Sequence, residues 1–464
     1  MTLMRLKKSN PIIAVLAAGL LLAACSRGPE GPKVETARLD NGLEIIVIPD
    51  FRADVVTHML WYRVGSADEP KGKSGIAHFF EHLMFRGTEN ISSGDFSKTV
   101  ARLGGQDNAF TSYDYTAYFQ RIAKDKLGKM MEMEAERMQK LIIQPDIVAV
   151  ERDVILEERS MRVDGRPAAL LNEQIRKRLH AGTPYEVPVI GWRKEIAQLN
   201  AADAGAFYQR YYAPDNAVLV VAGAVTLDEV KGLAETHYGP LKPSGQPRAP
   251  RQVAVQLSVT DYDKPEVLSD TRVRQRSWLR LYRLPQYQRD AKRQFAAADV
   301  LAEVLGGGLT GRLYQALVVE SQVAIGTGAY SDTSRLDNGE FIIYATPAEG
   351  TDFAKLASAV NTEIERVKNA PVTEEELRRA KRQLVSDLVF ARDSQQSMAN
   401  IFGRAAMLGL SPDDVLGWVD EIEAVTQDDV RYAARALLFE AHAITGHLAS
   451  EANASEANAS GGNK

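Results

Sequence analysis

The chain has 464 residues, of which 45% are hydrophobic, so it can bury substantial cores and is too long for one ordinary domain. Two domains are the default expectation at this length. The formal net charge is −5 at pH 7, and Lys and Arg are mixed with Asp and Glu along the chain. Such a chain has no broad basic field, which argues against a nucleic-acid-binding protein.

Residues 1–25 are organised like a bacterial targeting segment rather than a folded element. A positive stretch precedes an apolar core at residues 12–22, which is short for a membrane-spanning helix, and Leu22-Ala23-Ala24-Cys25 resembles a lipoprotein cleavage box. Cys25 is the only cysteine, so it has no intramolecular disulfide partner, whereas lipidation needs one thiol. We therefore expect a lipid anchor at Cys25 rather than the alternative, an uncleaved membrane anchor. Ser26 follows, where an Asp would favour inner-membrane retention, so the expected location is the outer membrane of the cell envelope, facing the periplasm.

Proline and glycine divide the rest of the chain. Residues 26–36 are expected to form a tether, and a proline-rich run near the middle of the chain breaks both helical and strand periodicity. The expected organisation is an N-terminal domain at 37–240, a linker at 241–254 and a C-terminal domain at 255–449. Residues 450–464 repeat a small polar unit, EANAS, which cannot bury a core and should be disordered.

Apolar patterns predict where elements lie in each half. In the first half we expect strands at 43–48, 55–64 and 218–222 and helices at 96–103 and 126–143. The second half repeats the theme, with strands at 273–284 and 340–345, helices at 290–305 and 311–320, and a triple-glycine turn at 306–308. This recurrence suggests two duplicated α+β units, each a mostly antiparallel sheet packed with helices.

The most informative motif is His78-Phe79-Phe80-Glu81-His82, in the order H-x-x-E-H. Two histidines four residues apart share one face of a helix, where neutral imidazoles can bind one zinc ion, and Glu81 projects from that face. A carboxylate beside a zinc-bound water is placed to take its proton. The alternative is two polar residues on a helix flank. Apolar residues on both sides argue against it, because unpaired polar groups in a buried segment are costly.

A third ligand candidate lies downstream, in a segment that follows Pro145-Asp146, a plausible helix start. Glu151 and Glu158 are seven residues apart, two helical turns, and so lie on one stripe of the helix. Such a pair could supply one zinc ligand and one supporting carboxylate that holds a ligand in place. The alternative is a solvated acidic helix with Arg152 and Arg159 as partners.

Together these segments resemble the pitrilysin family of zinc peptidases, peptidase family M16, also called inverzincins. Glu158 follows His82 by 76 positions and ends an E-R-x-V-I-L-x-E segment of the family type. Further stretches of the chain agree with the family pattern: residues 104–111, 185–191, 212–223 and 311–314. The resemblance spans roughly residues 36–448 and implies two related domains, each with a mostly antiparallel sheet packed with helices.

Carried over residue by residue, the resemblance implies that His78, His82 and Glu158 bind zinc, one ion per chain. It makes Glu81 the general base and Glu151 the supporting carboxylate. Three protein ligands leave zinc an open position for water, whose pKa the metal lowers to about 7. The implied activity is therefore that of an endopeptidase that uses metal-activated water.

Substrate capture is expected at Asn108, Ala109, Phe110 and Thr111. This segment alternates like a strand that continues through Tyr115 and Tyr118, and it matches the family's edge strand, which an extended peptide can join by backbone hydrogen bonds. The alternative is an interior strand. Because backbone pairing needs an extended partner, unfolded peptides should be favoured over folded proteins.

One departure from the family concerns an Arg and a Tyr in the C-terminal half that contact substrate near the zinc in active members. Alignment on residues 313–317 places Val318 and Ile325 at these positions, and neither side chain can donate a hydrogen bond. We infer that the chain is the zinc-bearing subunit of a two-subunit bacterial peptidase, whose homologous partner supplies the Arg and Tyr. The rival interpretation is a non-catalytic interaction or scaffold subunit of the same fold, against which the intact ligand set argues.

Overall fold

A computed structural model describes residues 33–246 and 264–451. The expected signal peptide with Cys25, the tether up to residue 32, residues 247–254 of the expected linker and residues 452–464 lie outside the described residues. The last two tether residues, 35 and 36, belong to strand β1 (Glu35–Arg38), so the folded region begins earlier than expected. Within the described ranges, every helix is too short or too polar to cross a membrane.

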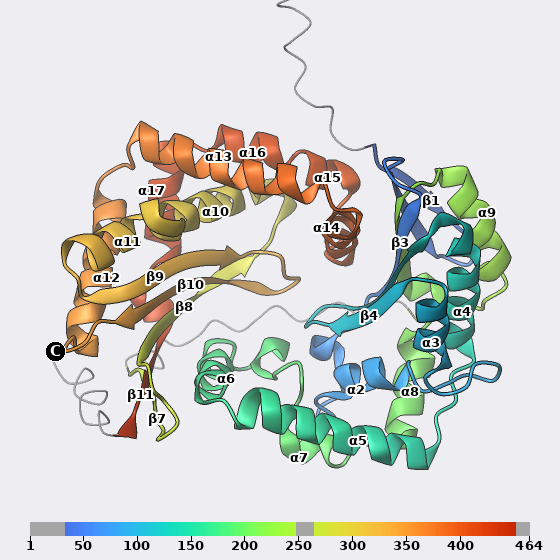
Figure 1. Cartoon of the computed structure of the whole chain (residues 1–464). Helices are drawn as coiled ribbons and strands as arrows, with labels where there is room; N and C mark the ends of the chain where they lie inside the picture. Colours follow the sequence, from blue (N-terminus) through green and yellow to red (C-terminus); the bar gives the residue numbers. More distant parts are fainter. Residues whose placement is uncertain (1–32, 247–263, 452–464) are drawn as a thin grey trace, which may run out of the picture. The chain divides into compact units, whose positions relative to one another are not determined.

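The first half forms a six-stranded sheet with the order β1-β2-β6-β3-β5-β4 (Figure 1). Its further strands are β2 (Glu44–Pro49), β3 (Val55–Tyr62), β4 (Gln106–Thr111), β5 (Thr116–Ala123) and β6 (Ala217–Gly223). Neighbouring strands are antiparallel except β2 and β6, which run parallel. The almost fully buried strands β3 and β6 lie at the centre of the sheet, where both faces are covered.

Helices cover one face of this sheet. The helices of the first half are α2 (Ile76–Leu83), α3 (Asp95–Arg102), α4 (Leu127–Gln139), α5 (Pro145–Arg159), α6 (Pro167–Leu179), α7 (Arg193–Ile196), α8 (Ala201–Tyr211) and α9 (Leu227–His237). Of these, α6 packs on the sheet of the second half instead. The core between helices and sheet includes Leu60 of β3, Phe80 of α2, Met130 of α4 and Phe207 of α8. Burying α2 in this way fixes the helix that carries the H-x-x-E-H motif.

The second half forms a five-stranded sheet with the order β7-β11-β8-β10-β9. Its strands are β7 (Glu266–Ser269), β8 (Ser277–Gln286), β9 (Ala324–Asp332), β10 (Asn338–Pro347) and β11 (Ala443–Ala449). Counted from β2 and from β7, both sheets have the order first, fifth, second, fourth, third, and in both the first and fifth strands are parallel. This shared topology confirms the expected pair of related α+β units.

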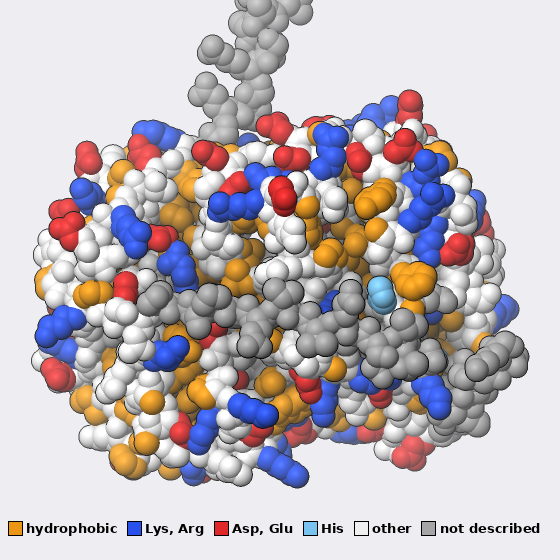
Figure 2. All heavy atoms as spheres, turned by 180° about the vertical axis from the view of Figure 1, so that it is seen from behind, with side chains coloured by type: hydrophobic (Ala, Val, Ile, Leu, Met, Phe, Trp, Pro, Cys, Tyr) orange, Lys and Arg blue, Asp and Glu red, His pale blue; other side chains and the backbone are white. Residues whose placement is uncertain are grey.

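The helices of the second half include the two expected at 290–305 and 311–320, together with others that the sequence pattern did not predict. The helices of this half are α10 (Lys292–Gly306), α11 (Arg312–Tyr314), α12 (Phe353–Asn369), α13 (Glu374–Ala391), α14 (Gln395–Met407), α15 (Pro412–Leu416), α16 (Trp418–Ala424) and α17 (Gln427–Leu437). The helix expected at 311–320 is regular only in α11 and continues as a π-helix at Gln315–Glu320. Acidic and basic side chains are interspersed over the face shown in Figure 2, in keeping with the nearly balanced composition.

One helix from each half packs against the outer face of the other half's sheet. From the second half, α14 packs Phe402 into a cluster with Trp61 of β3. From the first half, α6 packs Ile175 into a cluster with Ile342 of β10. Figure 1 shows α14 beside β3 and α6 below the second sheet. The two sheets are therefore buried on both faces by a reciprocal exchange of helices.

Both exchanged contacts require a glycine. A Cβ atom on Gly403 of α14 would lie 2.2 Å from Cε2 of Trp61, and one on Gly446 of β11 would lie 2.2 Å from Cδ1 of Ile175. Trp61 is only 1% exposed, so it has no room to move aside. Close approach of helix and sheet, rather than backbone flexibility, explains these two glycines.

A buried ionic cluster also joins the halves. The carboxylate of Glu340 in β10 accepts a 2.8 Å hydrogen bond from Nε2 of His180 and pairs with Arg176 at 3.0 Å and with Arg335 at 3.1 Å. Burial raises the pKa of Glu340, but the hydrogen bond from His180 and the two guanidinium groups outweigh it and hold that pKa well below its usual range. Because His180 and Arg176 come from the first half, a charged Glu340 ties the two halves together.

We expect Gly403→Ala to lower the free energy of unfolding by about 1–3 kcal/mol, because the added methyl group overlaps Trp61. The control is Gly205→Ala in α8, where an added Cβ meets nothing within 4 Å. That variant should be neutral or stabilised by up to about 1 kcal/mol through helix propensity. Urea unfolding followed by tryptophan fluorescence measures both. Equal stabilisation of the two variants would contradict the close packing of α14.

Candidate metal centre and active site

Tight backbone contacts fix the start of α2. Gly75, its N-cap residue, has a φ of +86°, and a Cβ on Gly191 would lie 2.5 Å from the backbone of Gly75. The carboxylate of Glu69 accepts hydrogen bonds from the N–H groups of Gly75 and Ala77, both at 2.9 Å. The first turn of α2, which carries His78, is thus held from two sides.

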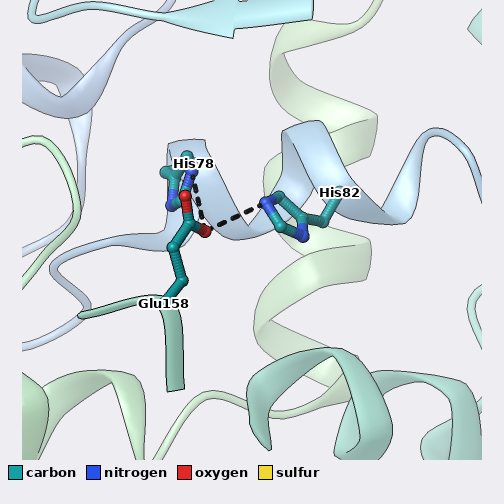
Figure 3. Close-up of side chains that lie close together, drawn as sticks. All are labelled: His78, His82 and Glu158. Carbon is teal, nitrogen blue, oxygen red and sulfur yellow. Dashed lines mark ion pairs between the residues drawn. The ribbon is translucent and has the colours of Figure 1, made fainter. Parts of the chain in front are cut away.

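His78 and His82 project from α2 towards Glu158 of α5 (Figure 3). Oε2 of Glu158 lies 3.6 Å from Nε2 of His78 and 3.4 Å from Nε2 of His82. These separations exceed the N–H···O hydrogen-bond range of about 2.7–3.2 Å. They match ligand atoms around a tetrahedral zinc ion, which lie about 3.3–3.6 Å apart for bonds of about 2.0–2.2 Å.

These three side chains also have the chemistry of a zinc ligand set. Oε2 of Glu158 is buried without a hydrogen-bond partner among the described residues, which is unusual for a carboxylate oxygen. Burial, together with His82 and Arg162, lowers the pKa of His78 to about 3, so its imidazole is neutral at pH 7, as a metal ligand must be. One ligand atom from each residue lies within 4.8 Å of the others, and in the described part of the chain this is the one such group. The residues present therefore fit a zinc ion.

Further charged groups hold these residues from outside. Glu151 lies 3.5 Å from Nδ1 of His82, and its other oxygen is 2.5 Å from Nη2 of Arg86. Burial raises the pKa of Glu151, but its contacts with His82 and Arg86 outweigh this and lower it. Nη1 of Arg162 lies 2.8 Å from Oε1 of Glu158, which leaves Oε2 facing the histidines. Glu158 is thus held by an ion pair, while Glu151 faces Nδ1 of His82 at a distance beyond a direct hydrogen bond.

The alternative of a solvated acidic helix is wrong. Glu151 and Glu158 are 1% and 9% exposed, and Arg159 pairs with Glu173 at 2.8 Å instead of with either of them. Arg162 was missed by sequence reasoning, although its spacing of four residues from Glu158 is a signal that could have found it. It lies in the π-helix Ser160–Asp164 that follows α5 directly. π-Helical turns of this kind are frequent at functional sites.

Glu81 lies beside the ligand set and contacts the edge strand. The hydroxyl of Thr111 in β4 donates a 2.5 Å hydrogen bond to Oε2 of Glu81. Burial raises the pKa of Glu81, and the hydrogen bond from Thr111 and the nearby His82 offset only part of this rise. A carboxylate with a raised pKa accepts a proton more readily than an exposed one. This geometry suits a general base.

The segment expected to capture substrate, Asn108 to Thr111, belongs to β4, and β4 is an edge strand rather than an interior one. The ring of Phe110 packs against Trp61, with centroids 5.3 Å apart, on the face of the sheet away from α2. The expected continuation of this strand is wrong. The chain turns after Thr111, and Tyr118 lies in the neighbouring strand β5, since simple alternation does not reveal a tight turn.

A cleft of about 1100 Å³ unites these groups. Its walls are the ligand face of α2, the backbone and side chains of β4 from Asn108 to Thr111, one face of α5 with the turn after it, and Val189-Ile190. All of the residues expected to bind metal, to act as base or to bind substrate line this cleft. The supporting carboxylate Glu151 does not line it, and Cys25 lies outside the described residues. The metal ligands thus open onto a space beside the edge strand.

Comparisons with known proteins agree with this geometry. Residues 45–191 match the model of the insulinase family, peptidase family M16, and residues 198–384 match the model of the peptidase M16 inactive domain. The chain belongs to peptidase family M16. It is 30% identical to the zinc protease PqqE of Helicobacter pylori over 381 residues. The aligned region covers 80% of this chain and 83% of that protein. An uncharacterized zinc protease of Streptomyces coelicolor is 31% identical over 417 residues, 87% of each chain.

Solved structures show the same fold. The crystal structure of a protease from Helicobacter pylori has a TM-score of 0.83 at 28% identity and covers 90% of this chain and 99% of that one. Pitrilysin has a TM-score of 0.75 at 17% identity, with 91% of this chain and 45% of pitrilysin covered. The expected family and the two-domain α+β fold are confirmed. The names of the sequence relatives support a zinc-dependent peptidase.

We expect zinc to raise the unfolding temperature of the metal-free protein, because an ion that binds only the folded state at 100 times its Kd adds about 2.7 kcal/mol. Glu158→Gln should lose most of this rise and most of the zinc that survives dialysis. The control is Glu157→Gln, the same charge change one residue away, which should keep both. Thermal unfolding with and without zinc, and elemental analysis, measure the two effects. Equal zinc retention by both variants would argue against Glu158 as a ligand.

Proposed function

We propose that the chain is a zinc endopeptidase that hydrolyses extended, unfolded peptides. The observation that carries the proposal is the meeting of His78, His82 and Glu158 with Glu81 and an edge strand in one cleft. The two histidines and Glu158 would hold the ion, one per chain. The zinc protease relatives support the same class of reaction.

In this mechanism the bound zinc would act as a Lewis acid and lower the pKa of a water to about 7. The other steps belong to the chain's own residues. The backbone of β4 binds the peptide as an added strand and so presents its carbonyl to the cleft. Glu81, oriented by Thr111, accepts a proton from the attacking water and returns it to the leaving amine. Glu151, 3.5 Å from Nδ1, places a negative charge behind the ring of His82.

We expect Glu81→Gln to retain zinc but to reduce kcat/KM on an unstructured fluorogenic peptide by about 100-fold to 10,000-fold, the range for loss of a general base. The amide keeps the size of the side chain and cannot accept the proton. Glu89→Gln, at a carboxylate that is 66% exposed and does not line the cleft, is the control and should keep full activity. Undiminished hydrolysis by zinc-loaded Glu81→Gln protein would reject Glu81 as the base.

We propose further that a homologous subunit completes the enzyme. Val318 lies in the π-helix Gln315–Glu320, and Ile325 of β9 is 59% exposed, so at the two positions expected for Arg and Tyr the chain offers only apolar side chains. The chain matches about half of two longer proteins of the fold, 45% of pitrilysin and 49% of the periplasmic protease PqqL from Escherichia coli. This supports an enzyme built from two modules of this size.

Purified alone, the chain should therefore hydrolyse peptides slowly. Adding a homologous chain that carries the Arg and Tyr should raise kcat/KM at least about tenfold, because each hydrogen bond to a charged group contributes about 1.5–3 kcal/mol. Activity measured together with light scattering relates turnover to the assembled species. Full turnover by a monomer would contradict the need for a partner.

The second candidate function is a non-catalytic interaction or scaffold subunit, and the match of residues 198–384 to an inactive-domain model is the observation in its favour. The metal-ligand cluster lies outside that range, which favours the peptidase. Zinc content together with the peptide assay separates the two. We also propose that Cys25 anchors the protein as an outer-membrane lipoprotein facing the periplasm, on the strength of its sequence context.

A further inference from the structure

The wall of the cleft formed by α5 has a regular pattern of apolar and acidic side chains. Val150, Asp153, Val154 and Glu157 line the cleft, and Met161 follows in the turn after α5. Their spacings of three and four residues place them on one face of the helix. Glu158, the metal-ligand candidate, lies on the same face. This wall therefore leads directly to the point where a bound peptide would be cut.

The apolar members of this wall are unusually exposed. Val150 is 60% exposed, Val154 41% and Met161 59%. Apolar side chains gathered in a cleft mark a binding surface, whereas isolated ones on a convex surface carry no such meaning. The cleft also contains a built polar site, since the nine-tenths-buried Glu158 turns an oxygen without a hydrogen-bond partner among the described residues towards the histidines.

Both carboxylates of the wall are available to a ligand. The side chain of Asp153 is 76% exposed, and Nε of Arg152 is 3.9 Å away, at the outer limit of an ion pair. Glu157 has no ion pair with any cation in the described ranges. The guanidinium of Arg162, which also lines the cleft, is bound to Glu158 at 2.8 Å. A positive group on the substrate would thus face little competition here.

Helix geometry sorts these residues into two similar pairs. Val150 is a neighbour of Asp153, and Val154 of Glu157, because residues three apart lie side by side on a helix. The pairs are four residues apart, about 6 Å along the axis. In an extended peptide every second side chain lies on the same side, about 6.6–6.8 Å apart. Figure 1 shows β4 and α5 on either side of α2, so a peptide on β4 faces this wall.

We propose that this wall selects peptides with Lys or Arg at two alternate positions on one side of the cut bond. A long basic side chain fits a valine and carboxylate pair, because its aliphatic stem covers apolar surface while its charged end reaches the carboxylate. Both pairs precede Glu158 in α5. Beyond it, Met161 is followed three residues later by Asp164, but this carboxylate is paired with Arg159 and Arg193 and does not line the cleft, so the preference belongs to one side only. This inference rests on the proposed function and adds a substrate class, extended cationic peptides.

The test uses a series of unstructured fluorogenic peptides that differ only at two alternate positions, which hold two Lys, two Gln or two Glu, placed on either side of the cut bond. On one side, kcat/KM should be about three- to tenfold higher for Lys than for Gln and lower still for Glu. The double variant Asp153→Asn, Glu157→Gln should bring the ratio of Lys to Gln close to one without loss of zinc. The matched control, Asp146→Asn with Glu89→Gln, should leave the ratio unchanged.

A second measurement separates this inference from the proposed function. Binding of the same peptides to zinc-loaded Glu81→Gln protein, followed by fluorescence anisotropy, reports the preference of the wall without any hydrolysis. Tighter binding of the Lys peptide that is lost in the double variant supports the proposed preference of the wall. If the unsubstituted protein cuts none of the peptides while this preference is seen, the peptidase proposal fails and the wall proposal stands. Hydrolysis or binding of all three peptides with equal efficiency overturns the wall and leaves the peptidase proposal standing.

Discussion

The structure depends on one contact, the approach of α5 to α2 that brings Glu158 within 3.4–3.6 Å of both histidine nitrogens. A buried carboxylate in such a position is costly unless a cation satisfies it. Gly191 holds both helices in place, since its backbone packs against Gly75 at the start of α2 and its carbonyl accepts a 2.8 Å hydrogen bond from Arg159 at the end of α5. A single close backbone approach thus sets the distance between two helices far apart in sequence.

The second half supports the site without contributing a residue to the metal cluster. Its helix α14 packs in a cluster that includes Phe402 and Trp61, and Phe110 of the edge strand packs against the same cluster. On its other face the strand holds Glu81 through Thr111. The strand that would receive a peptide is therefore held between the reactive groups and a helix of the other half. Rigidity of this kind is what positions a binding strand beside a catalytic group.

The sequence revealed the parts of the site that local spacing encodes. Two helical histidines with Glu81, and two glutamates seven apart, depend only on helix periodicity, and the structure brings them together. Contacts between distant segments left no such signal. Arg86 pairs with Glu151 from another helix end, and Gly403 matters only because it meets Trp61. The turn after Thr111 was missed because alternating apolar and polar residues look the same on both sides of a tight hairpin.

The two units share one topology but use the helix after their second strand differently. In the first unit this helix is α2, which presents the candidate metal ligands on one face and packs the other face into the core. In the second unit it is α10, whose buried residues are Ala, Val, Leu and Phe and which contains no histidine. A duplicated fold can therefore keep its packing while only one copy keeps the ligands. In this chain the candidate ligands therefore lie in the first unit alone, in a cleft walled by α2, α5 and the edge strand β4.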